Sequence, residues 1–382
     1  MMYQKNKSEL VWAVTLSVTL AFLAMPSLAL DLNLPDRLKA PAKDYDHVEN
    51  NAFLAIEQVE NRLVAVGERG VIIYSDDDGE SWRQANVPIS TLMTALDFSA
   101  KDNAWAVGHS GSILQSVDQG ENWSLVLEGN EINALLVQQA ELAVKEANTL
   151  YLNADEYDKE DLQYALEDAE FALSNAKFDR ELGPANPFLD ILFISELKGF
   201  AVGAYGLFVS TEDGGKSWQS AAHRLENFDR YHLNAIATIK GGALLIAGEA
   251  GTLFASYDQG QTWETLYGPY QGSYFGIQPL ANEDQALLYG LKGHVFKTED
   301  AGQTWQNVAT QVETSLTSSV ISASNDIVSA GLSGVVLVSD DHGETFSHIE
   351  TKGYESFNGV TVLETGDLML VSDEGVQFLA LP

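Results

Sequence analysis

Residues 65–82 read AVGERGVIIYSDDDGESW, and this combination of a G-x-x-G turn with an aspartate-rich turn ending in tryptophan recurs along most of the chain. The second glycine of the first turn returns about every 41 residues, except across one long interval. A repeat of about 40–45 residues is typical of the four-stranded blades of a β-propeller. The glycines that mark the repeats are Gly70, Gly111, Gly206, Gly251, Gly293, Gly334 and Gly375.

The second turn has the pattern S/T-x-D-x-G-x-S/T-W. Its aspartate can accept hydrogen bonds from nearby backbone N–H groups, its glycine supplies a positive φ, and its tryptophan can pack between neighbouring sheets. Asn122 replaces Ser/Thr in the second copy, and Phe346 replaces Trp in the sixth. We therefore predict an all-β fold, a seven-bladed β-propeller over residues 30–382. The copies end at Trp82, Trp123, Trp218, Trp263, Trp305 and Phe346.

The last repeat, residues 356–382, keeps its strand-like runs and Gly375 but ends before a second turn. A closed propeller can complete such a blade with a strand from the other end of the chain, which removes exposed strand edges. We expect this closing strand to come from residues 32–46.

One interval breaks the repeat, because Gly111 and Gly206 are 95 residues apart (206 − 111). The extra residues, 131–184, are rich in Ala, Leu, Glu and Asp and carry two series of apolar residues spaced 4,3,4,3, which predicts an α-helical hairpin. It follows the fourth strand of a blade, so it is expected on the same face as the G-x-x-G turns. The two series are Leu136, Ala140, Ala143, Ala147, Leu150 and Leu162, Leu166, Ala169, Leu173, Ala176.

The first 29 residues resemble a secretory signal peptide. Lys5 and Lys7 precede an apolar run, and Ser27 and Ala29 provide small residues for cleavage. Cleavage after Ala29 is the main prediction, and an uncleaved anchor is the alternative. The chain has no cysteine, which excludes a lipid-modified cysteine and disulfides. We predict a periplasmic or secreted protein, with peripheral association with the inner membrane.

The chain is strongly acidic, with 21 Lys and Arg against 55 Asp and Glu and a net charge of −34. Such a charge disfavours nucleic acid and anionic lipid, whose recognition depends on Lys and Arg. It is compatible with simple solubility, or with attraction to a basic partner surface or divalent cations.

The A-V-G-x-x-G turn followed by the S-x-D-x-G-x-S/T-W turn, called the Asp box below, resembles the exported propellers of the photosystem II stability/assembly factor type. The resemblance covers about residues 46–382 apart from the insertion. It implies a non-catalytic scaffold that holds a membrane-complex subunit during assembly. Relatives outside photosynthetic lineages look like periplasmic accessory proteins, some of them associated with RND-type transporters. Photosynthetic members use an Arg-rich patch, whereas the loop arginines here are Arg69, Arg224 and Arg230, which disfavours a photosystem client.

Asp-box propellers also include sialidases, which hold a carboxylate with three arginines from different blades. This chain has seven arginines, and the last is Arg230, so four blades provide none. The sequence has no Cys nucleophile, no G-x-S-x-G motif and no histidine pair at i,i+4. We predict no enzyme activity, catalytic residue, metal site or cofactor.

Aromatic and basic residues gather in the loops of the G-x-x-G face, where binding residues are usually found. We predict a monomeric propeller that acts as a binding or assembly scaffold for an envelope membrane protein or complex, with RND-type transporters as one client class. The hairpin either docks this partner or covers the central channel as a lid. The alternative function is a glycan-binding propeller, or a glycoside hydrolase of the sialidase-like class. The candidate binding residues are Arg69, His109, Tyr205, Arg230, Tyr231, His232, Tyr267, Tyr270, Tyr274, Phe275, Tyr354 and Phe357.

Overall fold

The computed structural model describes residues 36–184, 186–351, 353 and 355–381. In these residues seven antiparallel sheets follow one another along the chain, six with four strands and the last with three. Each sheet is a meander in which consecutive strands pair. We number them sheet 1 to sheet 7 in chain order.

The first three sheets contain β1 (Phe53–Val59), β2 (Arg62–Gly67), β3 (Ile72–Ser75), β4 (Arg83–Gln84); β5 (Met93–Ala100), β6 (Asn103–Gly108), β7 (Ser112–Ser116), β8 (Ser124–Leu127); and β9 (Phe188–Phe193), β10 (Gly199–Gly203), β11 (Phe208–Thr211), β12 (Gln219–Ser220). The next two contain β13 (Leu233–Thr238), β14 (Leu244–Gly248), β15 (Leu253–Ser256), β16 (Glu264–Thr265); and β17 (Tyr274–Pro279), β18 (Ala286–Gly290), β19 (Val295–Thr298), β20 (Gln306–Val308). The last two contain β21 (Leu316–Ile321), β22 (Ile327–Gly331), β23 (Val336–Ser339), β24 (Ser347–Ile349); and β25 (Phe357–Val362), β26 (Leu368–Ser372), β27 (Gly375–Leu379).

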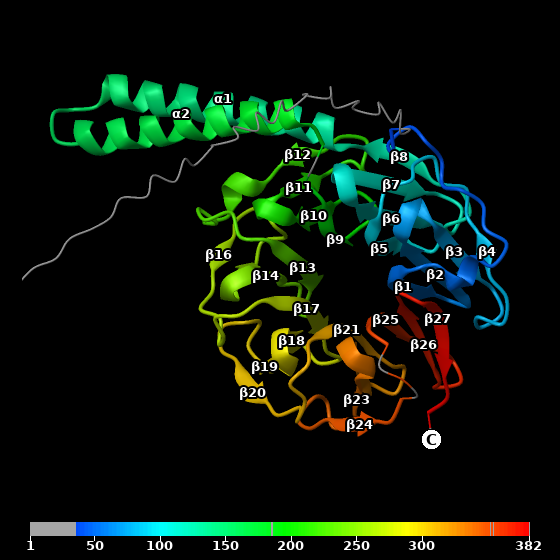
Figure 1. Cartoon of the computed structure of the whole chain (residues 1–382). Helices are drawn as coiled ribbons and strands as arrows, with labels where there is room; N and C mark the ends of the chain where they lie inside the picture. Colours follow the sequence, from blue (N-terminus) through cyan, green and yellow to red (C-terminus); the bar gives the residue numbers. More distant parts are fainter. Residues whose placement is uncertain (1–35, 185, 352, 354, 382) are drawn as a thin grey trace, which may run out of the picture. The chain divides into compact units, whose positions relative to one another are not determined.

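The sheets form a closed ring (Figure 1). The first strand of each sheet packs beside the first strand of the next, and β25 packs against β1. At this closure the Asn358 side chain donates a hydrogen bond from Nδ2 to the Phe53 carbonyl at 3.0 Å. The buried apolar clusters lie largely between neighbouring sheets. This is the arrangement expected for a seven-bladed propeller, with the seven first strands around a central channel.

The G-x-x-G turns connect the second and third strands of their sheets through one short 3-10 turn each, η2 to η4 and η6 to η8. The residue before the final glycine has a positive φ in these six turns, for example 54° at Arg69 and 57° at Tyr205, but not at Glu374, which precedes the seventh repeat glycine. At Gly70 a Cβ atom would lie 2.2 Å from the Ile89 carbonyl oxygen, so only glycine fits there. These turns are η2 (Glu68–Gly70), η3 (His109–Gly111), η4 (Ala204–Gly206), η6 (Glu249–Gly251), η7 (Leu291–Gly293) and η8 (Leu332–Gly334); η1 (Val48–Asn50) and η5 (Ala222–Arg224) lie elsewhere.

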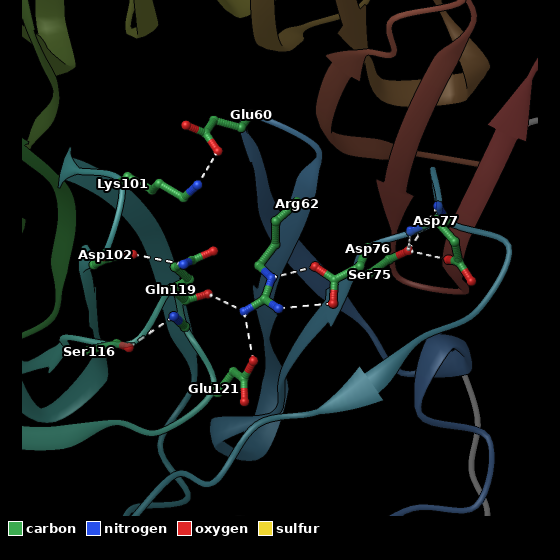
Figure 2. A network of polar contacts seen from close by, with 12 residues as sticks. Glu60, Arg62, Ser75, Asp76, Asp77, Lys101, Asp102, Ser116, Gln119 and Glu121 are labelled. Carbon is green, nitrogen blue, oxygen red and sulfur yellow. Dashed lines mark hydrogen bonds and ion pairs between the residues drawn. The ribbon is translucent and has the colours of Figure 1, made fainter.

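The Asp boxes connect the third and fourth strands, at the opposite end of each sheet from the G-x-x-G turns. Some residues of these boxes also link neighbouring sheets. Arg62 of sheet 1 bonds both carboxylate oxygens of Asp76, at 2.7 and 2.9 Å, and also reaches Glu121 (3.1 Å) and the Gln119 carbonyl (3.2 Å) in the box of sheet 2 (Figure 2). Lys101 and Glu60 form a second ion pair between the same two sheets.

The expected closing strand does not appear in the described part of residues 32–46. Residues 36–46 contain no strand and run along the outer side of sheet 1, where the Ala42 N–H donates to the Val87 carbonyl (3.1 Å). The Ser90 N–H donates to the Arg37 carbonyl (2.8 Å), and Gln84 binds the backbone of Lys43 and Tyr45. Among the described residues sheet 7 therefore keeps three strands.

The long interval contains two helices, α1 (Gly129–Asn153) and α2 (Lys159–Leu182), between β8 and β9. They pack side by side, and Figure 1 shows their far ends outside the ring. Glu128 caps α1 with a reciprocal bond to Glu131. In the part of the chain that the structure describes, neither helix has the length and apolarity needed to span a bilayer. The signal peptide predicted over residues 1–29 lies outside the described residues.

Candidate functional site

The base of the hairpin is fixed to the ring on the G-x-x-G face. Ile132 and Val137 of α1 are buried, and Ile132 joins an apolar cluster with Phe188 and Trp218. The Asn133 side chain donates a hydrogen bond to the Gly183 carbonyl at 3.2 Å, which ties the two ends of the hairpin together. Residues of α1 also pack on turn η3. The hairpin is thus joined to the scaffold at one end only.

Helix α2 has two apolar sides, and only one of them meets α1. The residues that the sequence placed on its inner side, such as Leu166 and Leu173, are half-buried. At about 100° per residue, the residues near the opposite side include four large apolar ones. We call these four residues the α2 stripe: Tyr164, Phe171, Phe178 and Leu182, which are 59%, 70%, 59% and 66% exposed.

The α2 stripe is bordered by acidic residues, because Glu160, Glu167 and Asp168 are exposed on the same half of the helix. No residue of α2 is buried. An exposed line of aromatic side chains with an acidic border is an unusual use of a helix surface, since most amphipathic helices keep one apolar side and bury it.

The structure brings three of the predicted binding residues together beside the hairpin. Arg230 pairs with Asp179 of α2 at 3.3 Å and donates to the Tyr205 carbonyl at 3.4 Å. The Tyr205 ring meets the His232 ring edge-on, with centroids 4.8 Å apart. Tyr231 lies between Arg230 and His232 in the sequence and is half-buried. These residues connect the hairpin to the loops of sheets 3 and 4.

A second part of the face carries two strongly exposed aromatic residues. Tyr267 is 97% exposed and Phe228 is 89% exposed. They lie at a shallow cavity of about 250 Å³ whose floor includes Phe254 and Leu266. Phe228 was absent from the predicted set, although it stands in the same aromatic loop as Tyr231.

Other predicted residues have structural roles. Tyr274 and Phe357 are buried in the first strands of sheets 5 and 7, so their side chains pack in the core. The Tyr274 hydroxyl donates to the Tyr270 carbonyl (3.0 Å) and accepts from its N–H (3.1 Å). Burial raises the pKa of Tyr274 to about 12. Tyr267, Tyr270 and Tyr274 therefore do not form one exposed platform for stacking on a sugar.

The remaining predicted residues are scattered. Arg69 and His109 are exposed on separate G-x-x-G turns. The pKa of His109 is lowered, mainly by partial burial of the ring and to a smaller extent by the nearby charge of Arg37. Phe275 lines the mouth of the central channel. Tyr354 lies outside the described residues.

The central channel has a volume of about 530 Å³ and contains three carboxyl groups, those of Glu57, Asp97 and Asp190. Asp97 accepts a hydrogen bond from the Phe193 N–H (2.6 Å), and Asp190 accepts one from the Ile236 N–H (2.8 Å), so these two aspartates each link neighbouring sheets. Burial among the first strands raises the pKa of Asp97 to about 6 and that of Asp190 to about 7. Burial, together with the two aspartates, raises the pKa of Glu57 well above its usual range.

The residues that line the channel and its mouth all come from the sheets. The hairpin is attached beside sheets 2 and 3 and runs outward (Figure 1), which disfavours its role as a lid. The three channel acids carried no sequence signal, because acidic residues are common throughout this chain. Within the described ranges, no three Asp, Glu or His side chains converge as ligands for a metal ion.

Comparisons with known proteins agree with this geometry. Residues 172–322 match the family model described as photosynthesis system II assembly factor YCF48. A curated relative, the photosystem II assembly lipoprotein Ycf48 of Synechococcus sp. (strain CC9902), is 36% identical over 83 residues, which cover 22% of this chain and 24% of the relative. The chain thus matches about a quarter of that relative's length.

Solved structures match over most of the chain. YCF48 bound to D1 peptide has a TM-score of 0.60 at 14% identity, covering 90% of this chain and 99% of that one. YCF48 from Cyanidioschyzon merolae has a TM-score of 0.58 at 13% identity, covering 87% and 96%. The WD40 propeller domain of Doa1 has a TM-score of 0.59 at 11% identity, covering 91% and 97%. At these identities the structures establish the fold, and together with the sequence matches they confirm an Asp-box propeller resembling the photosystem II assembly factors.

Proposed function

We propose that this protein is a non-enzymatic assembly scaffold that binds a subunit of an envelope membrane complex through its helical hairpin. The α2 stripe is the observation that carries the proposal. It offers four large apolar side chains in one line, on an element fixed to a rigid ring at one end and free at the other. Aromatic side chains of this kind dominate binding energies in protein interfaces.

The chemistry of the stripe defines its partner. Burying one such side chain contributes about 1.5–3 kcal/mol relative to leaving it exposed. The acidic border disfavours a second copy of the same acidic helix and favours Lys and Arg around the partner's apolar surface. A basic, partly apolar groove or helix face on a protein subunit fits both features.

The location rests on the N-terminal sequence and on the relatives. Residues 1–29 have the composition of a signal peptide, which supports export to the periplasm. One relative is named a lipoprotein and a similar structure is titled as bound to a D1 peptide, which supports an extracytoplasmic, protein-binding role. Among extracytoplasmic scaffolds that bind membrane proteins, we propose that this protein is an accessory protein of an RND-type transporter.

Affinity purification from gently solubilised envelopes tests the proposal. The tagged mature chain is compared with a variant in which Tyr164, Phe171 and Phe178 are replaced by Ser. The matched control replaces Leu142, Leu150 and Leu152 of α1, which are also exposed. We expect one integral membrane protein to be enriched by the wild type and the control and lost from the α2 variant. Enrichment that is equal for all three folded proteins contradicts docking through the stripe.

A further inference from the structure

Among the described residues, none pairs with the outer edge of the last strand of sheet 7. The other six sheets have a short fourth strand outside the third one, for example β24 outside β23. In sheet 6 this pairing joins Val336 to Ile349 and Val338 to Ser347. In sheet 7 the third strand is β27, and no described residue pairs with its outer side. A free strand edge presents unpaired N–H and C=O groups to another chain.

A groove of about 430 Å³ runs beside this edge. Its apolar wall is formed by Trp82 of sheet 1 and by Met369, Val376 and Phe378 of sheet 7, and Phe378 is 58% exposed. An exposed phenylalanine on an open edge strand is a feature that proteins usually avoid. The groove therefore has both the backbone groups and the apolar surface that an added strand needs.

The neighbouring pair of sheets shows what normally fills this position. Between sheets 1 and 2, Ala85 and Val87 follow β4 and pack with Trp123 in one buried cluster. The cluster between sheets 7 and 1 contains Trp82 and Met369 together with Tyr45 and Val48 of the N-terminal segment, but no described residue from a fourth strand. By analogy with Ala85 and Val87 against Trp123, a fourth strand added to sheet 7 would place small apolar side chains at positions i and i+2 against Trp82.

The border of the groove is acidic. Asp46, Glu49 and Glu80 line it, and among the described residues the only other titratable one in its lining is His47, which lies 3.6 Å from Glu49. The residues of an added strand that alternate with the apolar ones face this border or solvent. Lys or Arg at those positions complements the charge.

We propose that β27 accepts a fourth strand from a partner protein, an extended segment in which small apolar residues alternate with Lys or Arg. The main-chain ladder supplies affinity, and the Trp82 groove and its acidic border supply specificity, as in other cases of β-augmentation. This surface belongs to sheets 7 and 1, apart from the hairpin between sheets 2 and 3, and does not depend on the function proposed above.

Fluorescence anisotropy with two short labelled peptides tests the proposal. KVKAKVK can form a strand, whereas KPKAKPK has the same charge but lacks two of the backbone N–H donors. We expect the full mature chain to bind the first peptide at least about tenfold more tightly. Equal affinity for the two peptides overturns the proposal, because it shows attraction by charge alone.

Protein variants locate the binding to the groove. Phe378→Asp and Glu80→Lys are each expected to weaken binding of KVKAKVK at least about tenfold. Glu264→Lys, which changes an acid that is also exposed, on the fourth strand of sheet 4, should leave the binding of KVKAKVK unchanged. Equal loss in Glu264→Lys, or no loss in Phe378→Asp, contradicts the assignment.

The chain's own N-terminal part is the competing occupant. The protein has no cysteine, so a Leu32→Cys, Phe378→Cys variant can form only one intramolecular disulfide. Residue 32 lies outside the described residues. We expect the two thiols to stay unpaired in mild oxidant, as judged by mass spectrometry. Ready formation of the disulfide overturns the proposal, since it places the chain's own segment on β27.

Discussion

Asp258 accepts hydrogen bonds from four donor groups within its Asp box. These are the Thr262 hydroxyl (2.6 Å), the Thr262 N–H (2.9 Å), the Ser256 hydroxyl (2.8 Å) and the Gln261 N–H (3.0 Å). Bonds of this kind favour the charged carboxylate, and they lower the pKa of Asp258 to about 2. The pKa values of the equivalent Asp77 and Asp341 are also lowered to about 2, and those of Asp118, Asp213 and Asp300 are lowered as well. A turn that depends on a carboxylate in this way loses stability in acid.

The pH dependence of the stability follows from the difference between the pKa of Asp258 in the folded and unfolded states. The pKa of Asp258 is about 2 in the folded protein and 3.8 in the reference state, so its contribution is complete above pH 3.8 and is lost as the pH falls toward 2. We predict that Asp258→Asn is less stable than wild type at pH 7 and that the difference shrinks between pH 4 and 2. Urea denaturation across this range measures it. A constant difference contradicts the proposed role of the charge.

Arg62 tests how much one residue contributes to the contact between two sheets. Its guanidinium is largely buried and lies over the Tyr74 ring, 4.7 Å from the centroid, while Asp76 and Glu121 are partly exposed. We predict that Arg62→Met lowers the free energy of unfolding by about 1–2 kcal/mol, since water can satisfy the exposed carboxylates that remain. Arg83→Met, at an exposed arginine near the same ring, is the control and should change stability little. Chemical denaturation compares them.

At the scale of the element, the two sides of α2 should respond differently to the same change. Phe171→Ser removes an exposed side chain, so we predict a change in stability within about 0.5 kcal/mol. Leu166→Ser alters the side that meets α1 and should reduce the helical circular dichroism signal or lower the melting temperature. Similar losses in both variants would show that the α2 stripe packs against the protein itself and is unavailable to a partner.

At the scale of the whole molecule, the ring brings acids from three sheets into one channel. Because burial raises the pKa of Asp190 to about 7 and that of Asp97 to about 6, the folded state holds protons that the unfolded state releases. The contribution of these two carboxyl groups to the free energy of unfolding is complete below pH 3.8, where both are protonated. This contribution is lost as the pH rises through 6 and 7.

We predict that wild-type stability falls between pH 5 and 8, by at most about 1.4 kcal/mol per pH unit for each carboxyl group. Asp190→Asn should flatten this dependence, because the amide does not titrate. Thermal melts or urea titrations at pH 5, 6.5 and 8 compare the two proteins. A variant with the same slope as wild type would mean that Asp190 does not titrate in this range.

Much of the architecture could be predicted from local sequence. The G-x-x-G turns, the Asp boxes and the inserted helices all occur where their motifs placed them, because each is defined by residues a few positions apart. The predicted binding residues fall into separate groups in the structure. Tyr205, Arg230 and His232 come together, whereas Tyr274 and Phe357 are buried, since an aromatic residue at a loop boundary can face either the core or the solvent.

The sequence by itself determined the repeat, its turns and the position of the hairpin, because turn chemistry and helical periodicity act over short distances. Only the tertiary structure decided which side of α2 remains exposed, since α2 has two apolar sides and only its packing on α1 distinguishes them. It also decided that residues 36–46 follow sheet 1 instead of completing sheet 7, and that Glu57, Asp97 and Asp190 meet in one channel. These outcomes depend on contacts between residues far apart in the chain, which no local pattern specifies.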